Sequence, residues 1–184
     1  MQFEPQPIPD VMLIIPRRFE DGRGFFMETF RQDLFDAHCG RHEFVQDNHS
    51  RSSLGVLRGL HYQIDQPQGK LVRAITGEIL DVAVDIRRDS PFCGQWVSAH
   101  LSAENGHQLW LPPGFAHGFL VLSEVAEVAY KATDYYAPSC ERSVRWDDAT
   151  LAIDWQPQRW AWEGLPALSE KDRKAPAWAD ASPG

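Results

Sequence analysis

The segment Glu78–Ile86 constrains the fold more than any other part of the chain. From Asp81 to Ile86 it reads D-V-A-V-D-I, so valine or isoleucine occupies every second position. A period of two places successive side chains on opposite faces of a β-strand. The segment therefore predicts a strand with one apolar face and one wet face, the latter carrying Asp81 and Asp85.

Short segments with strand character recur along the chain, separated by glycine, proline and asparagine. They are Val11–Ile15, Val56–Tyr62, Lys70–Ile75, Trp96–Leu101, Gln108–Leu111, Phe119–Leu122 and Glu127–Thr133. This pattern favours an antiparallel β-sandwich or small barrel. Helical spacing of apolar residues predicts one helix over Glu28–His38, ended by Gly40. We expect a mainly β protein with a few short helices, in which residues 1–184 form one domain with a weakly ordered tail at about 174–184.

Charge and apolar content narrow the class of protein. The net charge of −8 argues against a nucleic-acid-binding surface. No segment approaches the run of about 18 apolar residues that a membrane helix needs, and the N-terminal segment lacks the features of a signal peptide. The cysteines, Cys39, Cys93 and Cys140, form no C-x-x-C pair and are expected to be reduced thiols. These features predict a cytoplasmic protein.

The stretch Phe44–Gln63 places polar residues densely between apolar ones. A core strand would leave such groups unpaired, at a cost of roughly 1–3 kcal/mol each, so the stretch predicts a pocket wall. Histidine changes charge near neutral pH, which makes His61 a candidate general base. Arg58 and His61 are three positions apart and would point to opposite faces of an ideal strand. A bulge at Gly59 would bring them to one face.

The histidines also raise the question of a metal. Residues 112–118, P-P-G-F-A-H-G, resemble the second cupin motif, in which a proline–glycine turn leads to a ligand histidine, here His117. The first cupin motif has two histidines one residue apart, followed by a glutamate. This chain has His61 and Gln63 there, with no glutamate close behind. Because an amide is a poor metal ligand, we expect no metal. His117 is then either a turn histidine bonded to backbone or part of a substrate site.

Three further side chains have both an ordinary and a functional interpretation. Tyr130 shares a strand face with Val128 and Ala132, which is typical of a core tyrosine whose hydroxyl finds a partner. Lys70 enters a strand after a turn and resembles a surface lysine. Asp172, in L-S-E-K-D, resembles a solvated loop acid. It becomes functional if it folds back to orient a histidine.

Some arginines are suited to phosphate contacts. A guanidinium matches phosphate oxygens with two parallel hydrogen bonds, whereas an isolated arginine is more often a surface ion-pair partner. The sequence contains no Walker loop and no dinucleotide glycine fingerprint. If a nucleotide binds, side chains must hold it, and the candidates are Arg23, Arg58 and Arg73.

A series of motifs carries a resemblance to a known family. In chain order they are D-G-R-G-F-F-M-E, F-V-Q-D-N-H-S, V-L-R-G-L-H-Y-Q, Q-G-K-L-V-R, D-V-A-V-D-I-R, L-W-L-P-P-G-F-A-H-G-F, Y-K-A-T-D-Y-Y-A-P and L-S-E-K-D. They extend from about residue 8 to 173. Each is weak alone, but together they resemble the dTDP-4-dehydrorhamnose 3,5-epimerases, cupin-fold enzymes of dTDP-L-rhamnose biosynthesis.

The resemblance implies a cupin-type jelly roll and an isomerase that uses no metal and no organic cofactor. Its substrate would be dTDP-4-dehydro-6-deoxy-D-glucose, in which the C4 carbonyl acidifies the protons on C3 and C5, and its product dTDP-4-dehydro-L-rhamnose. By resemblance His61 is the base and Asp172 orients its imidazole. Tyr130 returns a proton from the opposite face, and Lys70 steadies the enolate oxygen.

The resemblance also implies how the substrate is held. Tyr136 would stack on the thymine ring. Other positions that match the nucleotide-sugar site of the family are Arg23, Glu28, Gln46, Asn48, Arg58, His117, Glu141 and Lys171. Family members are homodimers whose N-terminal segments reach into the partner's site, so Arg23 and Glu28 would serve the neighbouring chain.

Alternatives remain open at the level of the sequence. The scaffold also suits an epimerase of a single carbon or a ketoisomerase of a dTDP-keto-sugar. A metal-dependent cupin and a non-catalytic jelly roll that binds sugar nucleotides are the other two candidates. The presence of both Tyr130 and Tyr136 favours double epimerisation.

Overall fold

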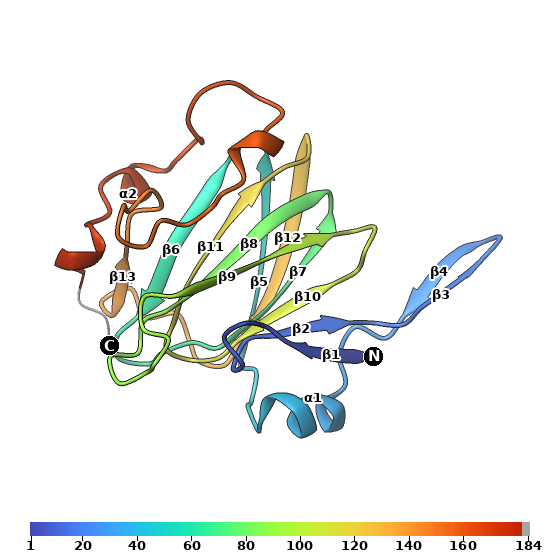
Figure 1. Cartoon of the computed structure of the whole chain (residues 1–184). Coiled ribbons are helices and arrows are strands. Elements are labelled where there is room, and N and C mark those ends of the chain that lie inside the picture. Colours follow the sequence, from blue (N-terminus) through green and yellow to red (C-terminus); the bar gives the residue numbers. More distant parts are fainter. Residues whose placement is uncertain (182–184) are drawn as a thin grey trace.

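Two facing antiparallel sheets form the body of the computed structural model, which describes residues 1–181 (Figure 1). The six-stranded sheet has the spatial order β1 (Gln2–Pro5), β2 (Met12–Ile15), β10 (Gln108–Leu111), β7 (Lys70–Thr76), β12 (Val125–Ala132) and β5 (Gln46–Ser53). The five-stranded sheet has the order β13 (Glu141–Ser143), β6 (Leu57–Gln63), β11 (Phe115–Val121), β8 (Glu78–Asp85) and β9 (Trp96–Ser102).

The main core lies between the two sheets. Val72 on β7, Ala83 on β8 and Leu109 on β10 are completely buried there and belong to one apolar cluster. The apolar residues of β12, such as Val128, join the same cluster from the six-stranded sheet. The mainly β jelly roll with a few short helices, expected from the sequence, is confirmed.

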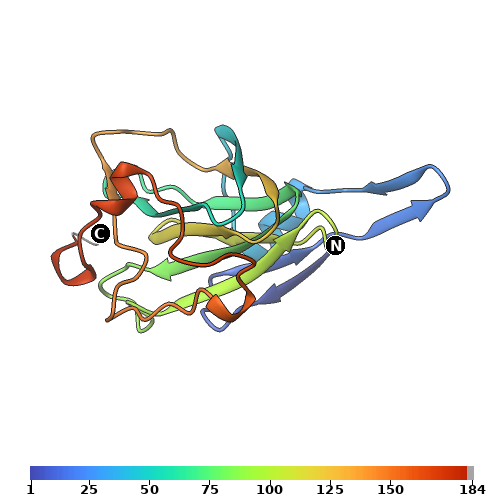
Figure 2. The same ribbon diagram turned by 90° about the horizontal axis from the view of Figure 1, so that it is seen from above.

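A hairpin projects from one end of the sandwich (Figures 1 and 2). It consists of β3 (Arg18–Asp21) and β4 (Gly24–Met27) and belongs to neither sheet. Its aromatic residues Phe19, Phe25 and Phe26 are 50%, 52% and 71% exposed. Large exposed aromatic side chains in one place mark a surface for another molecule.

The helices are short: α1 (Gln32–Cys39), α2 (Glu170–Arg173) and the 3₁₀ turns η1 (Pro157–Arg159) and η2 (Trp178–Asp180). The helix predicted over Glu28–His38 begins later, because the chain is still extended at Arg31 as it leaves the hairpin. It ends before Gly40, as predicted, and buries Phe35 against Trp110. None of the helices within residues 1–181 has the length and apolar character needed to cross a membrane.

The faces of β8 are arranged differently from the sequence prediction. Asp81 and Asp85 are completely buried, so the wet face predicted for this strand is wrong. The apolar face, with Leu80 and Val82, points out of the sandwich and is covered by a Trp-rich C-terminal segment that includes Trp155. Because this second apolar layer covers the face with Leu80 and Val82, the face with Asp81 and Asp85 lies toward the interior of the sandwich.

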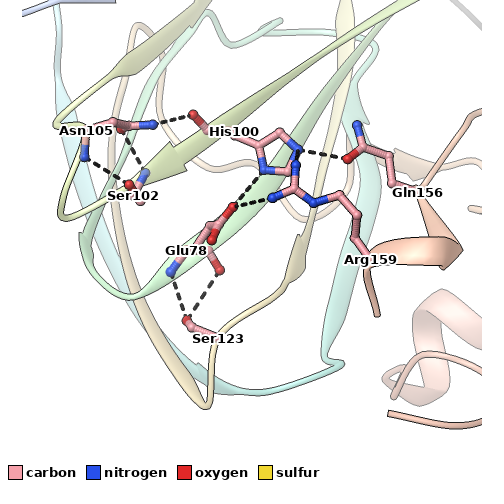
Figure 3. Close-up of polar contacts among 7 residues, drawn as sticks. All are labelled: Glu78, His100, Ser102, Asn105, Ser123, Gln156 and Arg159. Carbon is pink, nitrogen blue, oxygen red and sulfur yellow. Dashed lines mark hydrogen bonds and ion pairs between the residues drawn. The ribbon is translucent and has the colours of Figure 1, made fainter. Parts of the chain in front are cut away.

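A polar cluster fastens the C-terminal segment to the edge of the five-stranded sheet (Figure 3). His100 on β9 lies at its centre, with Nδ1 2.8 Å from Glu78 Oε1 and Nε2 2.8 Å from Gln156 Oε1. Arg159 in η1 approaches the same imidazole at 3.1 Å and Glu78 at 3.4 Å. These contacts bring residues 156–159 against strands that lie more than 50 positions earlier.

The tail expected at about 174–184 is described as far as residue 181. It contains η2, and the backbone N–H of Trp178 donates to Asp148 Oδ2 at 2.9 Å. Residues 182–184 lie outside the described residues.

The bulge predicted at Gly59 is present. In the pairing of β6 with β11, His61 lies opposite His117 and Arg58 lies opposite Phe119, so three steps on β6 match two on β11. Gly59 has a φ of +110°, in a region that side-chain-bearing residues rarely adopt. The extra residue turns Arg58 and His61 into the same cavity, as the sequence requires for a shared site.

Gly59→Ala should destabilise the protein. An added Cβ would lie 2.5 Å from the His117 carbonyl oxygen and 2.6 Å from Gly118 Cα, both backbone atoms. We expect the free energy of unfolding to fall by at least about 1–3 kcal/mol, the cost of a disfavoured backbone conformation. Urea unfolding measures this, with Gly22→Ala as control because an added Cβ there meets nothing within 4 Å. Equal losses in the two variants would mean that β6 relaxes around the methyl group.

Candidate active site

His61 on β6 and Asp172 on α2 form a hydrogen-bonded pair although they are 111 residues apart. His61 Nε2 lies 2.5 Å from Asp172 Oδ1, and the two side chains are 28% and 4% exposed. An ionised carboxylate can only accept hydrogen bonds, so Nε2 carries the proton and Nδ1 keeps the lone pair that a base requires. Asp172 is thus not the solvated loop acid that its local sequence suggests.

The surroundings of Asp172 keep its carboxylate ionised. Burial raises the pKa of Asp172, but the hydrogen bond and charge of His61, the Ser169 hydroxyl and the Gly59 backbone N–H together lower it below its ordinary value. A negative charge at this position stabilises an imidazolium on His61. The pair is therefore suited to taking a proton from a bound molecule.

Lys70 is the first residue of β7 and is almost completely buried. Burial lowers the pKa of Lys70 to about 8; the charges of Asp81 and Glu141 oppose this, and that of Lys171 adds to it. Its ammonium lies 6.0 Å from the centre of the Tyr130 ring. A buried cation at neutral pH attracts an anion formed beside it.

Tyr130 lies on the inner face of β12 and packs against the main core with Val128. This is the face predicted from strand parity. Burial raises the pKa of Tyr130, and the negative charge of Glu141 raises it further, whereas Arg58 opposes the rise. The phenol therefore keeps its proton at neutral pH and is able to donate it.

These four side chains line one cavity of about 430 Å³. His61 comes from the five-stranded sheet, whereas Lys70 and Tyr130 come from the six-stranded sheet that faces it (Figure 1). A flat molecule held between the two walls meets the imidazole on one side and the phenol on the other. This arrangement supports removal of a proton from one face and its return to the other.

Two other predicted residues line the same cavity. His117 lies within β11, and its Nε2 is 2.7 Å from Asp81 Oδ1 in a buried pair, so its partner is a side chain and not the backbone. Arg58 donates from Nε to Ser52 Oγ at 3.0 Å. Since that contact occupies one edge of the guanidinium, its remaining N–H groups are directed elsewhere and suit a phosphate.

A linked group of predicted binding residues is not part of the cavity lining, but the charge of one member, Glu141, acts on both Lys70 and Tyr130. The Tyr136 hydroxyl donates to Glu141 Oε2 at 2.7 Å, and Lys171 pairs with the other oxygen of that carboxylate. Gln46 accepts from the Tyr136 backbone N–H at 2.9 Å and donates to Asn48 Oδ1 at 3.0 Å. The Tyr136 ring is 52% exposed, which leaves it free to stack on a base.

The structure does not bring every candidate to this cavity. Arg23 and Glu28 lie at the hairpin and beyond its end, and the Arg23 side chain is 90% exposed and paired with Asp21. Arg73 lines a different cavity, to which Asn48 and Tyr130 also contribute, and it does not line the cavity of His61. Within one chain, Arg23, Glu28 and Arg73 are therefore separate from the His61 site.

The described side chains do not form a metal-binding cluster. Among residues 1–181, no group of three or more His, Cys, Asp or Glu side chains is arranged to hold a metal ion. Gln63, at the second histidine position of the cupin motif, donates to the carbonyls of Gln66 and Tyr135 at 2.7 and 3.2 Å. It also accepts from the Ala137 N–H at 2.8 Å.

Comparison with protein families agrees with this geometry. The family model described as dTDP-4-dehydrorhamnose 3,5-epimerase matches residues 5–180. The chain belongs to this epimerase family. The match includes both residues of the His61–Asp172 pair, and it extends over all the strands of the sandwich except the start of β1.

Individual relatives share nearly the whole length of this epimerase. A dTDP-4-dehydrorhamnose 3,5-epimerase from Pseudomonas aeruginosa is 61% identical over 175 residues, which are 95% of this chain and 94% of that protein. The crystal structure of dTDP-6-deoxy-D-glucose-3,5-epimerase from Legionella pneumophila with dTDP-4-keto-L-rhamnose is 49% identical, with a TM-score of 0.89 over 96% of this chain and 92% of that one. A 3'-monoepimerase from Streptomyces bikiniensis in complex with dTDP-quinovose is 34% identical, with a TM-score of 0.86 over 95% and 87% of the two chains.

Three side chains that support this epimerase site were not predicted. Gln63 holds the loop that carries Tyr136, Asp81 pairs with His117, and Ser169 bonds Asp172. The alternation of β8 contains Asp81, but it was interpreted as a wet face. Neither Gln63 nor Ser169 has a recognisable sequence signal. Gln63 contacts a loop that is distant in the sequence, and Ser169 caps a helix too short to predict.

Proposed function

We propose that this epimerase converts dTDP-4-dehydro-6-deoxy-D-glucose to dTDP-4-dehydro-L-rhamnose by inverting C3 and C5, a step of dTDP-L-rhamnose biosynthesis. The observation that carries the proposal is the placement of the His61–Asp172 pair and Tyr130 on opposite walls of one cavity. Inversion at carbon needs a base and an acid on opposite faces, and this cavity supplies both. The family membership supports the same reaction.

The chemistry follows from the positions of the groups. The C4 carbonyl acidifies the proton on the neighbouring carbon, and His61 Nδ1 takes that proton as the C–H pair of electrons moves into an enolate. Asp172 stabilises the resulting imidazolium. The Lys70 ammonium stabilises the enolate oxygen, and the Tyr130 hydroxyl then delivers a proton to the other face. His61 then releases its proton to solvent and Tyr130 takes one up from solvent, so that base and acid are restored before the same sequence inverts the second carbon.

The nucleotide is held outside the reaction chamber by the linked group of Tyr136. We assign base stacking to the exposed Tyr136 ring, and hydrogen bonds to Gln46, Asn48, Glu141 and Lys171. Arg58 is assigned to the diphosphate, and His117 to the sugar because it lines the cavity and is buried.

The direct test is NMR in heavy water with purified protein and dTDP-4-dehydro-6-deoxy-D-glucose. Deuterium should enter at both C3 and C5, and the product should be the L-sugar. Deuterium at one carbon only would identify a single-carbon epimerase, the activity named for the Streptomyces bikiniensis relative. A moved carbonyl would identify a ketoisomerase. Activity that a chelator removes and iron or zinc restores would identify a metal-dependent cupin.

The pH dependence of the reaction tests the role of Lys70. The useful form is the ammonium, and its pKa is about 8, so kcat/KM should fall as pH rises through about 8. Lys70→Arg keeps a cation throughout, because the pKa of a guanidinium lies above about 12. We expect Lys70→Arg to be slower but to lack the decline near pH 8. The same decline in both proteins would assign it to another group.

We further propose that the epimerase is a homodimer in which the β3–β4 hairpin enters the partner's site. Phe19, Phe25 and Phe26 are exposed to solvent in the single chain, and contact with a partner would bury them. Arg23 and Glu28 are remote from the cavity of their own chain. Mixing Arg23→Ala with His61→Ala subunits tests this. Exchanged subunits would combine one intact site with one doubly altered site, so the mixture should regain activity that neither variant has. No recovery after demonstrated subunit exchange would contradict a shared site.

We also propose a cytoplasmic location. Cys39, Cys93 and Cys140 are all free thiols, which suits a reducing compartment. A nucleotide sugar is also made where nucleoside triphosphates are available. Fractionation of cells that express the tagged protein tests this, and recovery outside the cytoplasm would contradict it.

A further inference from the structure

We infer that Ser169 is a positioning residue that fixes the Asp172 carboxylate in the orientation His61 requires. Ser169 does not touch the reacting atoms and acts through Asp172. The inference rests on the proposed function, in which the His61–Asp172 pair removes the proton.

Each oxygen of the Asp172 carboxylate has its own partner. Oδ1 lies 2.5 Å from His61 Nε2, and Oδ2 accepts from the Ser169 hydroxyl at 2.7 Å. A carboxylate bound at one oxygen is able to rotate about its Cβ–Cγ bond, whereas one bound at both is not. The Gly59 backbone N–H also donates to this carboxylate. The Ser169 contact is the side-chain bond at Oδ2, and it adds to these in holding Oδ1 toward the imidazole.

Ser169 also caps the short helix that carries Asp172. Its Oγ accepts from the Asp172 backbone N–H at 3.1 Å, while its O–H donates to Oδ2 of the same residue. One hydroxyl thus holds both the backbone and the side chain of Asp172. The two functions use different properties of the hydroxyl, its lone pair and its proton, and substitutions separate them.

The segment before Ser169 is hydrogen-bonded to the backbone at the start of the strand that carries His61. The Ala167 N–H donates to Gly55 O at 2.8 Å, and the Leu57 N–H donates to Ala167 O at 3.0 Å. These bonds form a parallel bridge between Val56 and Ala167 just before β6. Because His61 and Ser169 are anchored to the same stretch of backbone, their positions relative to Asp172 are set together.

The electrostatic effect acts in the same direction. Burial raises the pKa of Asp172, and the Ser169 hydroxyl is one of the hydrogen-bond donors that bring it below its ordinary value. With the carboxylate kept anionic, the proton of the imidazolium stays on His61. Ser169 is itself exposed. When its hydroxyl is removed, a mobile water takes its place at Oδ2 and holds the carboxylate less firmly.

Three substitutions at Ser169 distinguish positioning from capping. Ser169→Thr keeps both the cap and the donor, Ser169→Ala removes both, and Ser169→Asp keeps the cap but replaces the donor with a negative charge. We expect kcat close to wild type for threonine and about 10-fold lower for alanine, the lower end of the effect of losing an outer-shell partner. For aspartate kcat should be at least as low as for alanine. KM should change little in all three.

A spectroscopic readout accompanies the kinetics. The proton between His61 and Asp172 should give a far-downfield NMR resonance that survives in Ser169→Thr and moves or broadens in Ser169→Ala and Ser169→Asp. Wild-type kcat in Ser169→Asp would show that only the cap matters, and wild-type kcat in Ser169→Ala would remove any role. Either result overturns the inference. Failure of the wild-type protein to exchange deuterium into the substrate would instead overturn the proposed function, and the resonance would still report whether Ser169 orders the pair.

Discussion

His61→Ala is expected to lose nearly all turnover while the sandwich stays folded. A positioned general base contributes about 10²–10⁴-fold to a proton transfer, and His61 Nδ1 is the lone pair that Asp172 leaves available in the cavity. Without the imidazole, Asp172 is left as a buried carboxylate, and water is a much weaker base. Both deuterium exchange and product formation should therefore fall together by at least that factor.

The control for this variant is His38→Ala. His38 lies on the exposed surface of α1, where its Nδ1 contacts the Leu34 carbonyl, and it is outside the cavity. Its replacement removes the same chemical group and should leave the rate unchanged. Circular dichroism of both variants establishes that they are folded. Deuterium exchange in His61→Ala at the rate of the control would remove His61 from the mechanism.

Tyr130→Phe is expected to separate proton removal from inversion. His61, Asp172 and Lys70 are unaffected by the change, so exchange at the first carbon should continue. The face opposite the imidazole then has no phenol to return the proton, and the proton returns from His61 or from water. Exchange with retained configuration should rise relative to epimerised product, and the overall yield of the L-sugar should fall steeply.

Deuterium incorporation and product stereochemistry, measured on one sample, give this ratio. Tyr135→Phe is the matched control, because the Tyr135 side chain is 61% exposed and lies outside the cavity lining. This control also removes a phenolic hydroxyl, but one that lies outside the reaction chamber. An unchanged ratio of inversion to exchange in Tyr130→Phe would assign the acid to another group.

Most of the central strands were predictable from the sequence, whereas the polar strand β5 and the short strands β1, β3, β4 and β13 were not. The environment of the strand faces was predictable only in part. On β12, the parity of Tyr130 with Val128 correctly placed the phenol inside, because a single core lies on that side. On β8, the same reasoning failed for Asp81 and Asp85. Period two shows that two faces differ, but it does not show that a distant Trp-rich segment, with no period of its own, will cover the apolar one.

The candidate site shows the same limit. Arg58 and His61 required a bulge, and Gly59 was the residue that permitted it. Asp172 had no local signal, since a loop acid and an orienting carboxylate have the same sequence context. Its pairing with His61 depends on the path of the chain over 111 positions, and only the resemblance to a family indicated it. Contacts of that range are set by tertiary packing, which pattern alone does not encode.

The separation of His61 from Asp172 also has a consequence during synthesis on the ribosome. All strands of the six-stranded sheet, and His61 itself, have been translated by residue 132, forty positions before the carboxylate. A chain that ends at that point lacks Asp172, so under the proposed mechanism it lacks a competent base. It also leaves Leu80 and Val82 without their Trp-rich cover, which exposes an apolar surface to chaperones and proteases. The segment after residue 132 thus supplies both the carboxylate of the proposed base and the cover of the outer apolar layer.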